Sequence, residues 1–175
     1  MKISCMGCGY VGLVAGTCLA DMGNEVTCCD IDKVKINKLN RGVIPIYEPG
    51  LNDMFERNVK GKRLHFSSDM KTTIKNSDVI FVTVGTPPGE NHEADLCAVE
   101  SVAELIGKNM KSYKLIVNKS TVPVGTAELV KKIVRKNQGV ECEFDVVSNP
   151  EFLREGEAVK DFTNPDRIVI GTDSE

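Results

Sequence analysis

The chain has 175 residues, of which 41% are hydrophobic and 27% charged, and this suits one globular domain with a sizeable core. A formal net charge of -3 provides no basic surface for a nucleic-acid backbone, so we expect no nucleic-acid partner. No apolar stretch approaches the roughly 18 residues that span a bilayer, and the first residues lack the form of a signal peptide. We therefore expect a cytoplasmic protein with no membrane partner. The chain has seven cysteines, an odd number, and thiols stay reduced in the cytoplasm, so we expect neither a disulfide framework nor a metal site.

Short apolar runs alternate with longer amphipathic ones along the chain. This alternation is typical of strand–helix units that build a parallel sheet. We predict strands at residues 2–6, 25–29, 64–66, 79–84, 114–118, 145–148 and 167–170. Helices are predicted between them, at residues 11–22, 32–40, 50–60, 69–76, 95–110 and 125–137. The expected fold is α/β, a doubly wound parallel sheet of the Rossmann type with helices on both faces, in one domain over residues 1–175.

The first predicted strand leads directly into a glycine-rich turn. The stretch "GCGYVG" places Gly7, Gly9 and Gly12 in the spacing GxGxxG at the mouth of a predicted helix. In this pattern the first glycine permits a tight turn, the second lets a pyrophosphate approach the backbone, and the third lets the helix pack on the strand. The N–H groups at the helix start then face the phosphates. The turn therefore predicts a dinucleotide-binding site.

An acidic residue, Asp30, ends the second predicted strand. Its carboxylate suits the hydroxyls of the adenosine ribose, whereas the 2′-phosphate of NADP would meet a like charge. Lys33 and Lys35 follow closely and could pair with such a phosphate, although solvated helix charges are the simpler interpretation. We therefore predict NAD as the cofactor.

Threonines follow two further predicted strands. Thr86 lies in "VGTPP" (84–88), and Thr121 lies in "VNKSTVPVGT" (117–126). Open parallel sheets bind ligands at the carboxyl ends of their strands, so both hydroxyls are candidates for the cofactor site. An ordinary loop hydroxyl is the alternative interpretation of Thr86.

The stretch "SNPEFLREGEAVKDFTNPDRIVIG" (148–171) places Glu151 and Glu155 four residues apart. Asn149 suits a helix cap, Pro150 a first helical position and Gly156 a helix end, so one interpretation is a short capped helix. The same turn would put both glutamates on one face at the carboxyl edge of the sheet. There a carboxylate can serve as a general acid or base.

With the glycine motif, these stretches and "GVIPIYEPGL" (42–51) resemble the NAD-binding N-terminal part of the UDP-glucose/GDP-mannose dehydrogenase family, and the resemblance runs through essentially the whole chain. It implies an enzyme that oxidises C6 of a nucleotide sugar from alcohol to carboxylate with two NAD, through a cysteine-bound thiohemiacetal and thioester. UDP-glucose 6-dehydrogenase is the expected activity. GDP-mannose and UDP-N-acetylmannosamine are alternative substrates.

The resemblance also implies roles for individual residues. It implies NAD contacts for Val11, Asp30, Lys35, Thr86, Thr121 and Glu155. Catalytic roles are implied for Glu151, as acid/base, and Thr121, which would help to hold water. Substrate contacts are implied for Glu151, Phe152, Leu153, Arg154 and Glu155. Tyr47, Glu48 and Pro49 are expected to form only a turn or cap.

In the family, the nucleophilic cysteine, a catalytic lysine and most of the nucleotide-sugar site lie in a second half, beyond a central helix that builds a homodimer. We therefore expect this chain to bind cofactor without a complete active site. A regulatory NAD-binding module without catalysis is a second possibility, because fold alone does not determine function. Such a module would need the glycine turn and Asp30, but it has no use for the paired glutamates. Another type of NAD-dependent dehydrogenase would lack the later motifs.

Overall fold

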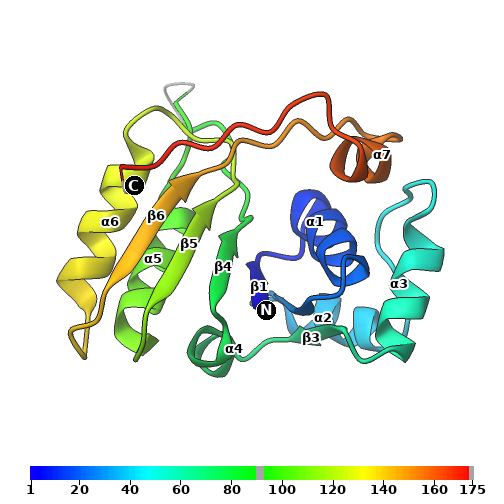
Figure 1. Cartoon of the computed structure of the whole chain (residues 1–175), viewed down its shortest axis with the longest axis horizontal. Coiled ribbons are helices and arrows are strands. Elements are labelled where there is room, and N and C mark those ends of the chain that lie inside the picture. Colours follow the sequence, from blue (N-terminus) through cyan, green and yellow to red (C-terminus); the bar gives the residue numbers. More distant parts are fainter. Residues whose placement is uncertain (90–92, 174–175) are drawn as a thin grey trace.

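The computed structural model describes residues 1–89 and 93–173 (Figure 1). Its strands are β1 (Lys2–Met6), β2 (Glu25–Cys29), β3 (Leu64–Ser67), β4 (Val79–Val82), β5 (Lys114–Asn118) and β6 (Phe144–Ser148). Its helices are α1 (Tyr10–Asp21), α2 (Lys33–Asn40), α3 (Leu51–Lys60), α4 (Met70–Asn76), α5 (Cys97–Asn109), α6 (Thr126–Asn137) and α7 (Ala158–Thr163). The predicted strands and helices up to residue 148 are confirmed, with ends within two residues.

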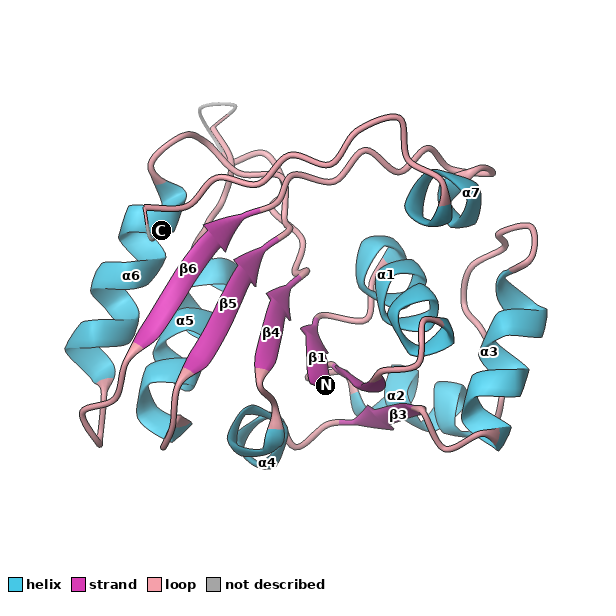
Figure 2. Ribbon diagram, viewed as in Figure 1, coloured by secondary structure: helices cyan, strands magenta, loops and turns pink. Residues whose placement is uncertain are grey.

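The six strands form one parallel sheet in the order β3-β2-β1-β4-β5-β6. Figure 2 shows α5 and α6 beside the β4–β6 half, and α1 and α3 beside the other half. The direction of winding reverses between β1 and β4, which is where doubly wound sheets bind ligands. The predicted Rossmann-type α/β fold is therefore confirmed.

Two hydrophobic clusters cover the two faces of the sheet. One joins alternate side chains of the strands to α1, α2 and α3, and the other joins the remaining strand side chains to α4, α5 and α6. Burial on both faces explains why the strands read as short continuous apolar runs in the sequence. In the described part of the chain, no helix has the length and apolar content needed to cross a bilayer. The cytoplasmic location stays a prediction.

The predicted strand at 167–170 is wrong. Ile168 and Ile170 are 68% and 65% exposed, and only Gly171 forms an isolated antiparallel bridge, with Ser148 at the end of β6. The cause is α7, which the sequence did not predict and which lies over the carboxyl end of the sheet beside α1 (Figure 1). From there the chain runs back across the strand ends, so it meets β6 in the antiparallel direction.

The short helix expected at 149–156 is also wrong, because residues 149–154 are not helical. Asn149 does not cap a helix: its backbone N–H donates to the Asn118 carbonyl at 3.0 Å. Its side-chain amide is also engaged elsewhere, because Oδ1 accepts from Lys119 Nζ at 3.2 Å and Nδ2 donates to the Val169 carbonyl at 2.9 Å. Glu151 and Glu155 therefore do not share a helical face.

Candidate functional site

The glycine turn between β1 and α1 is shaped by close packing against the end of β4. A Cβ atom on Gly7, which has φ +108°, would lie 2.7 Å from the Thr83 carbonyl oxygen. One on Gly12 would overlap the Gly7 carbonyl oxygen and lie 2.6 Å from Thr83 Oγ1. A Cβ on Gly9 would have no atom within 4 Å. Gly7 and Gly12 are thus needed by the protein's own packing, whereas Gly9 leaves its outer side open for a ligand.

A cavity of about 340 Å³ opens beside this turn, between β1, β2, β4 and α5. Gly7, Gly9, Asp30 and Lys35 line its polar end, and mainly apolar residues line the rest: Ile31, Met70, Thr83, Val84, Gly85, Ala98, Ser101, Val102 and Leu105. An apolar wall with a carboxylate at one end suits a planar base joined to a ribose. Four residues predicted for the cofactor therefore meet here.

Asp30 is buried and already holds several donors. Its carboxylate accepts from Cys8 N at 2.9 Å, from Asp32 N at 3.0 Å and from Lys35 Nζ at 2.8 Å. Burial opposes its ionisation, yet these bonds outweigh burial and hold the Asp30 pKa below its usual value. The same ion pair raises the Lys35 pKa. Since Asp30 already balances its charge, Lys35 is a weak attractant for a 2′-phosphate.

These features fit the adenosine half of NAD. Lys35 is the partly exposed member of the ion pair, with 31% of its side chain accessible, so ribose hydroxyls can share or replace its bond to Asp30. The two backbone donors hold the carboxylate in place without it. The open side of Gly9 gives a pyrophosphate access to the start of α1.

A second cavity, of about 220 Å³, lies on the other side of the same turn. Four separate stretches line it, comprising residues 9–11, 83–86 and 119–121 together with Glu151. Gly9 lines both cavities, so together they can hold the two halves of a dinucleotide. The structure brings Val11, Thr86, Thr121 and Glu151 together here, and Thr86 Oγ1 donates to the Thr121 carbonyl at 2.6 Å.

Glu151 reaches this second cavity from an extended segment. One of its oxygens accepts from Leu153 N at 2.6 Å, which orients the carboxylate, and the residue as a whole is half-buried. Glu155 is exposed and lines neither cavity. Its predicted contacts with cofactor and substrate stay predictions.

Lys119, which directly follows β5, was missed by sequence reasoning. It is 6% exposed and lines the second cavity with Glu151. Its Nζ donates to Asn149 Oδ1 at 3.2 Å and lies 5.7 Å from the centre of the Phe162 ring. Burial lowers the Lys119 pKa, and the Glu151 carboxylate opposes that shift. One feature of the sequence could have identified Lys119, because it is a charged residue directly after a buried strand, at the ligand-binding edge of the sheet.

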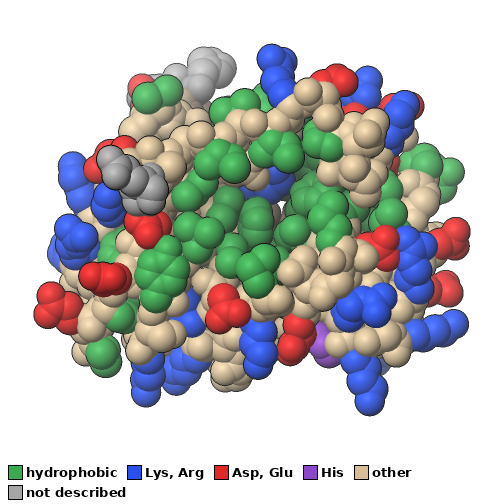
Figure 3. Space-filling model, viewed as in Figure 1, with side chains coloured by type: hydrophobic (Ala, Val, Ile, Leu, Met, Phe, Trp, Pro, Cys, Tyr) green, Lys and Arg blue, Asp and Glu red, His purple; other side chains and the backbone are tan. Residues whose placement is uncertain are grey.

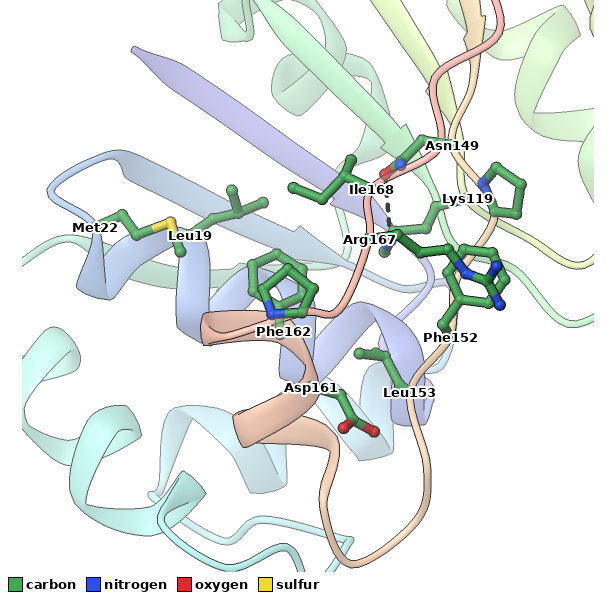
Figure 4. Close-up of a pocket in the computed structure, with 12 residues that line it drawn as sticks. Leu19, Met22, Lys119, Asn149, Phe152, Leu153, Asp161, Phe162, Arg167 and Ile168 are labelled. Atoms are coloured by element: carbon green, nitrogen blue, oxygen red, sulfur yellow. Dashed lines mark hydrogen bonds between the residues drawn. The ribbon is translucent and has the colours of Figure 1, made fainter.

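A third cavity, of about 250 Å³, lies beneath the 149–168 segment. Figure 4 shows Lys119 and Asn149 joined there, with Phe152, Leu153, Phe162 and Ile168 around them. Figure 3 shows hydrophobic side chains gathered around a hollow in the middle of this face. Among the predicted substrate contacts, Phe152 and Leu153 line this third cavity rather than the one that holds Glu151.

Arg154, another predicted substrate contact, is engaged with neighbours in its own segment. Its guanidinium pairs with Asp161 at 2.6 Å and with Glu157 at 3.4 Å. Its role in substrate binding stays a prediction.

Glu48, expected to be only a turn or cap residue, is a buried carboxylate at 3% exposure. It accepts hydrogen bonds from Tyr10 and from backbone N–H groups at Gly156 and Ala158. A signal existed in the sequence, because Glu48 is the charged residue of an apolar loop held by Pro45 and Pro49. That signal does not identify its distant partners.

Comparison with known proteins places these features in a family. Residues 1–175 match the model of the UDP-glucose/GDP-mannose dehydrogenase family, NAD binding domain. A UDP-glucose 6-dehydrogenase of Bacillus subtilis is 56% identical over 173 residues, which cover 99% of this chain and 38% of that protein. The chain thus spans about two fifths of the length of the curated relatives it matches most strongly.

Solved structures support the same family assignment. A UDP-glucose dehydrogenase from Pyrobaculum islandicum has a TM-score of 0.94 and 41% identity, over 99% of this chain and 41% of that one. A GDP-mannose dehydrogenase from Pseudomonas aeruginosa has a TM-score of 0.93 and 38% identity, over 98% of this chain and 41% of that one. The chain therefore belongs to the UDP-glucose/GDP-mannose dehydrogenase family, as its NAD-binding domain.

Proposed function

We propose that this chain is the NAD-binding part of a UDP-glucose 6-dehydrogenase, an enzyme that oxidises UDP-glucose to UDP-glucuronate with two NAD. The observation that carries the proposal is the cavity that joins Glu151 and Thr121 to the open side of the glycine turn. A regulatory NAD module would have no need of a carboxylate at that end. Three curated relatives at 45–56% identity carry the name of this enzyme, which favours UDP-glucose over the alternative sugars.

Asp30 and the glycine turn, which contains Gly7, Gly9 and Gly12, would hold the cofactor. Val11 and Lys35 would make further contacts with it. When bound, NAD supplies the hydride acceptor for both oxidations. This chain would contribute the placement of the nicotinamide half beside Val11, Thr86 and Thr121, in the second cavity.

Glu151 would act as the acid/base of the reaction. A carboxylate at the edge of a cofactor cavity can take a proton from a water that attacks a thioester and can return it to a leaving group. Thr121 lies in the same cavity, and its hydroxyl would help to hold that water. The buried Lys119 ammonium would supply positive charge near the carboxylate. These roles make Glu151 and Thr121 the catalytic residues of this chain.

The test is Glu151→Gln in the full-length enzyme, with Glu128→Gln, an exposed position in α6, as matched control. After mixing with UDP-glucose and NAD, mass spectrometry should detect an acyl-enzyme adduct in the Glu151 variant, with turnover slowed about a hundredfold or more. The control should behave as the native protein does. Unchanged turnover in Glu151→Gln would reduce this residue to a structural role.

We also propose that the nucleophilic thiol, the catalytic lysine and a homodimer interface are supplied by parts of the enzyme outside residues 1–175. The enzyme would act in the cytoplasm. The support is the share of the relatives' length that this chain spans. The 175-residue chain alone should bind NAD, produce no NADH from UDP-glucose, and sediment as a monomer. Steady turnover by the chain alone would contradict the proposal that essential catalytic groups lie outside residues 1–175.

A further inference from the structure

Glu48 is a buried charge that lies outside both cofactor cavities. It sits in the loop between α2 and α3, next to Tyr47, whose side chain is 87% exposed, while Glu48 itself is 3% exposed. A buried carboxylate is costly unless donors surround it. The donors that Glu48 has gathered therefore indicate what the residue does.

Those donors come from two remote parts of the chain. The Tyr10 hydroxyl donates to Glu48 Oε2, which also accepts from Gly156 N at 2.9 Å, while Glu48 Oε1 accepts from Ala158 N at 2.7 Å. Burial opposes ionisation of Glu48, yet these bonds outweigh burial and hold its pKa below the usual value. Glu48 is thus an ionised anchor for both segments.

One of these segments is the approach to α7. Gly156 adopts φ +87°, and Glu157, at the start of α7, makes no side-chain capping bond of its own. Glu48 therefore satisfies the N–H groups on either side of Glu157, although it lies 108 to 110 residues away in sequence. Without it, the chain directly after Glu151 and Glu155 would lose these polar bonds and be held by the apolar packing of Ala158 and Val159 on α1 and α3.

The other segment is the glycine turn. Tyr10 is the first residue of α1 and lines the second cavity with Glu151, and its hydroxyl also lies 3.4 Å from the Arg154 carbonyl oxygen. A single carboxylate thus connects the cofactor turn with the segment that carries the predicted substrate contacts.

We propose that Glu48 is a positioning residue, which fixes residues 154–158 against the cofactor turn so that the nucleotide sugar meets an ordered segment beside NAD. This rests on the proposed function. Glu48 does not touch the reacting atoms. Its removal should therefore weaken sugar binding far more than NAD binding, which depends on Asp30 and the glycine turn.

The first measurement is hydrogen exchange on the 175-residue chain with and without NAD. In Glu48→Gln an amide N–H₂ replaces one acceptor oxygen, so one of the Gly156 and Ala158 amides loses its acceptor and its exchange should accelerate about tenfold or more. NAD affinity should stay within about threefold of native. Glu56→Gln, an exposed glutamate in α3, is the matched control and should change neither quantity. Unchanged exchange at both amides in Glu48→Gln would overturn the proposal.

Tyr10→Phe tests the same link in a variant that keeps Glu48, in case Glu48→Gln fails to fold. It removes one donor and leaves Glu48 bound to both backbone N–H groups, so the domain should fold and exchange at Gly156 should rise less than in Glu48→Gln. NAD should protect the two amides further in the native chain and less so in Tyr10→Phe. Equal protection in both chains would show that Tyr10 does not link the two sites.

The second measurement uses the full-length enzyme. Glu48→Gln should raise the KM for the nucleotide sugar about tenfold and leave the KM for NAD unchanged. A fall in kcat with both KM values unchanged would contradict a positioning role. If the native enzyme shows no activity on any nucleotide sugar, the proposed function fails, whereas the exchange measurement still decides the link between Glu48 and the 154–158 segment.

Discussion

The glycine-turn region, residues 1–35, and the 149–171 segment meet at the same cavity but are held in different ways. In the first, Asp30 is held by bonds within one β–α–β unit, from Cys8, Asp32 and Lys35, while the glycine turn packs against Thr83 after β4. The second depends on distant residues, with Lys119 bonded to Asn149 and Glu48 bonded to Gly156 and Ala158. Local bonds thus position the carboxylate at the cofactor end of the site, whereas long-range bonds position the segment at the other end.

The largest expected effect separates two glycines of the turn. Gly12→Ala would place a Cβ against the Gly7 carbonyl and Thr83, so we expect a loss of about 3 kcal/mol in the free energy of unfolding. Gly9→Ala meets no atom within 4 Å and should fold normally, but its methyl group would obstruct the pyrophosphate. Denaturant titration and calorimetry with NAD distinguish the two effects. Equal stability of the two variants would contradict this division between packing and binding.

The second prediction concerns the cofactor end alone. Asp30→Ala removes the acceptor for the ribose hydroxyls, so NAD affinity should fall by about 2 kcal/mol, while NADP affinity should fall less because a like charge is also removed. Titration calorimetry is the suitable method, since the chain has no tryptophan. Native NADP affinity equal to that for NAD would refute the role given to Asp30.

The third prediction concerns the long-range end. Asn149→Ala removes the acceptor of the buried Lys119 ammonium and the donor to the Val169 carbonyl at 2.9 Å. We expect the free energy of unfolding to fall by about 1–2 kcal/mol. Hydrogen exchange should accelerate in residues 167–171 and remain native in β1 and β2. Acceleration spread evenly over both regions would remove the contrast between them.

The smallest expected effect is a pH dependence at the link between the two regions. Burial, followed by the bond to Glu48, raises the Tyr10 pKa to about 12. A raised pKa means that Tyr10 contributes stability that is present below its ordinary value near 10 and lost as pH rises through about 12. Tyrosinate absorbance should show Tyr10 ionising near the upper end of this window. In Glu48→Gln its pKa should move toward 10 and remain above it, because burial persists.

The sheet, its helices and the residues of the cofactor end could be predicted from the sequence. Apolar runs buried on both faces specify parallel strands, and Asp30 is held by neighbours within one β–α–β unit. Gly7 and Gly12 could be predicted because their spacing is a recurrent motif, although the atoms that they pack against belong to Thr83, after β4. The family resemblance added Thr86, Thr121 and Glu151, and the structure brings these residues to one cavity.

The course of the chain after β6 depends on tertiary contacts that the sequence does not reveal. Asn149 has the local chemistry of a helix cap, a preference worth about 1 kcal/mol, but its side chain is bound by Lys119 and Val169 instead. Glu48 looks like a turn residue until the fold brings Gly156 and Ala158 to it. These contacts join residues 20 to 110 positions apart, and local patterns carry no information about such pairs.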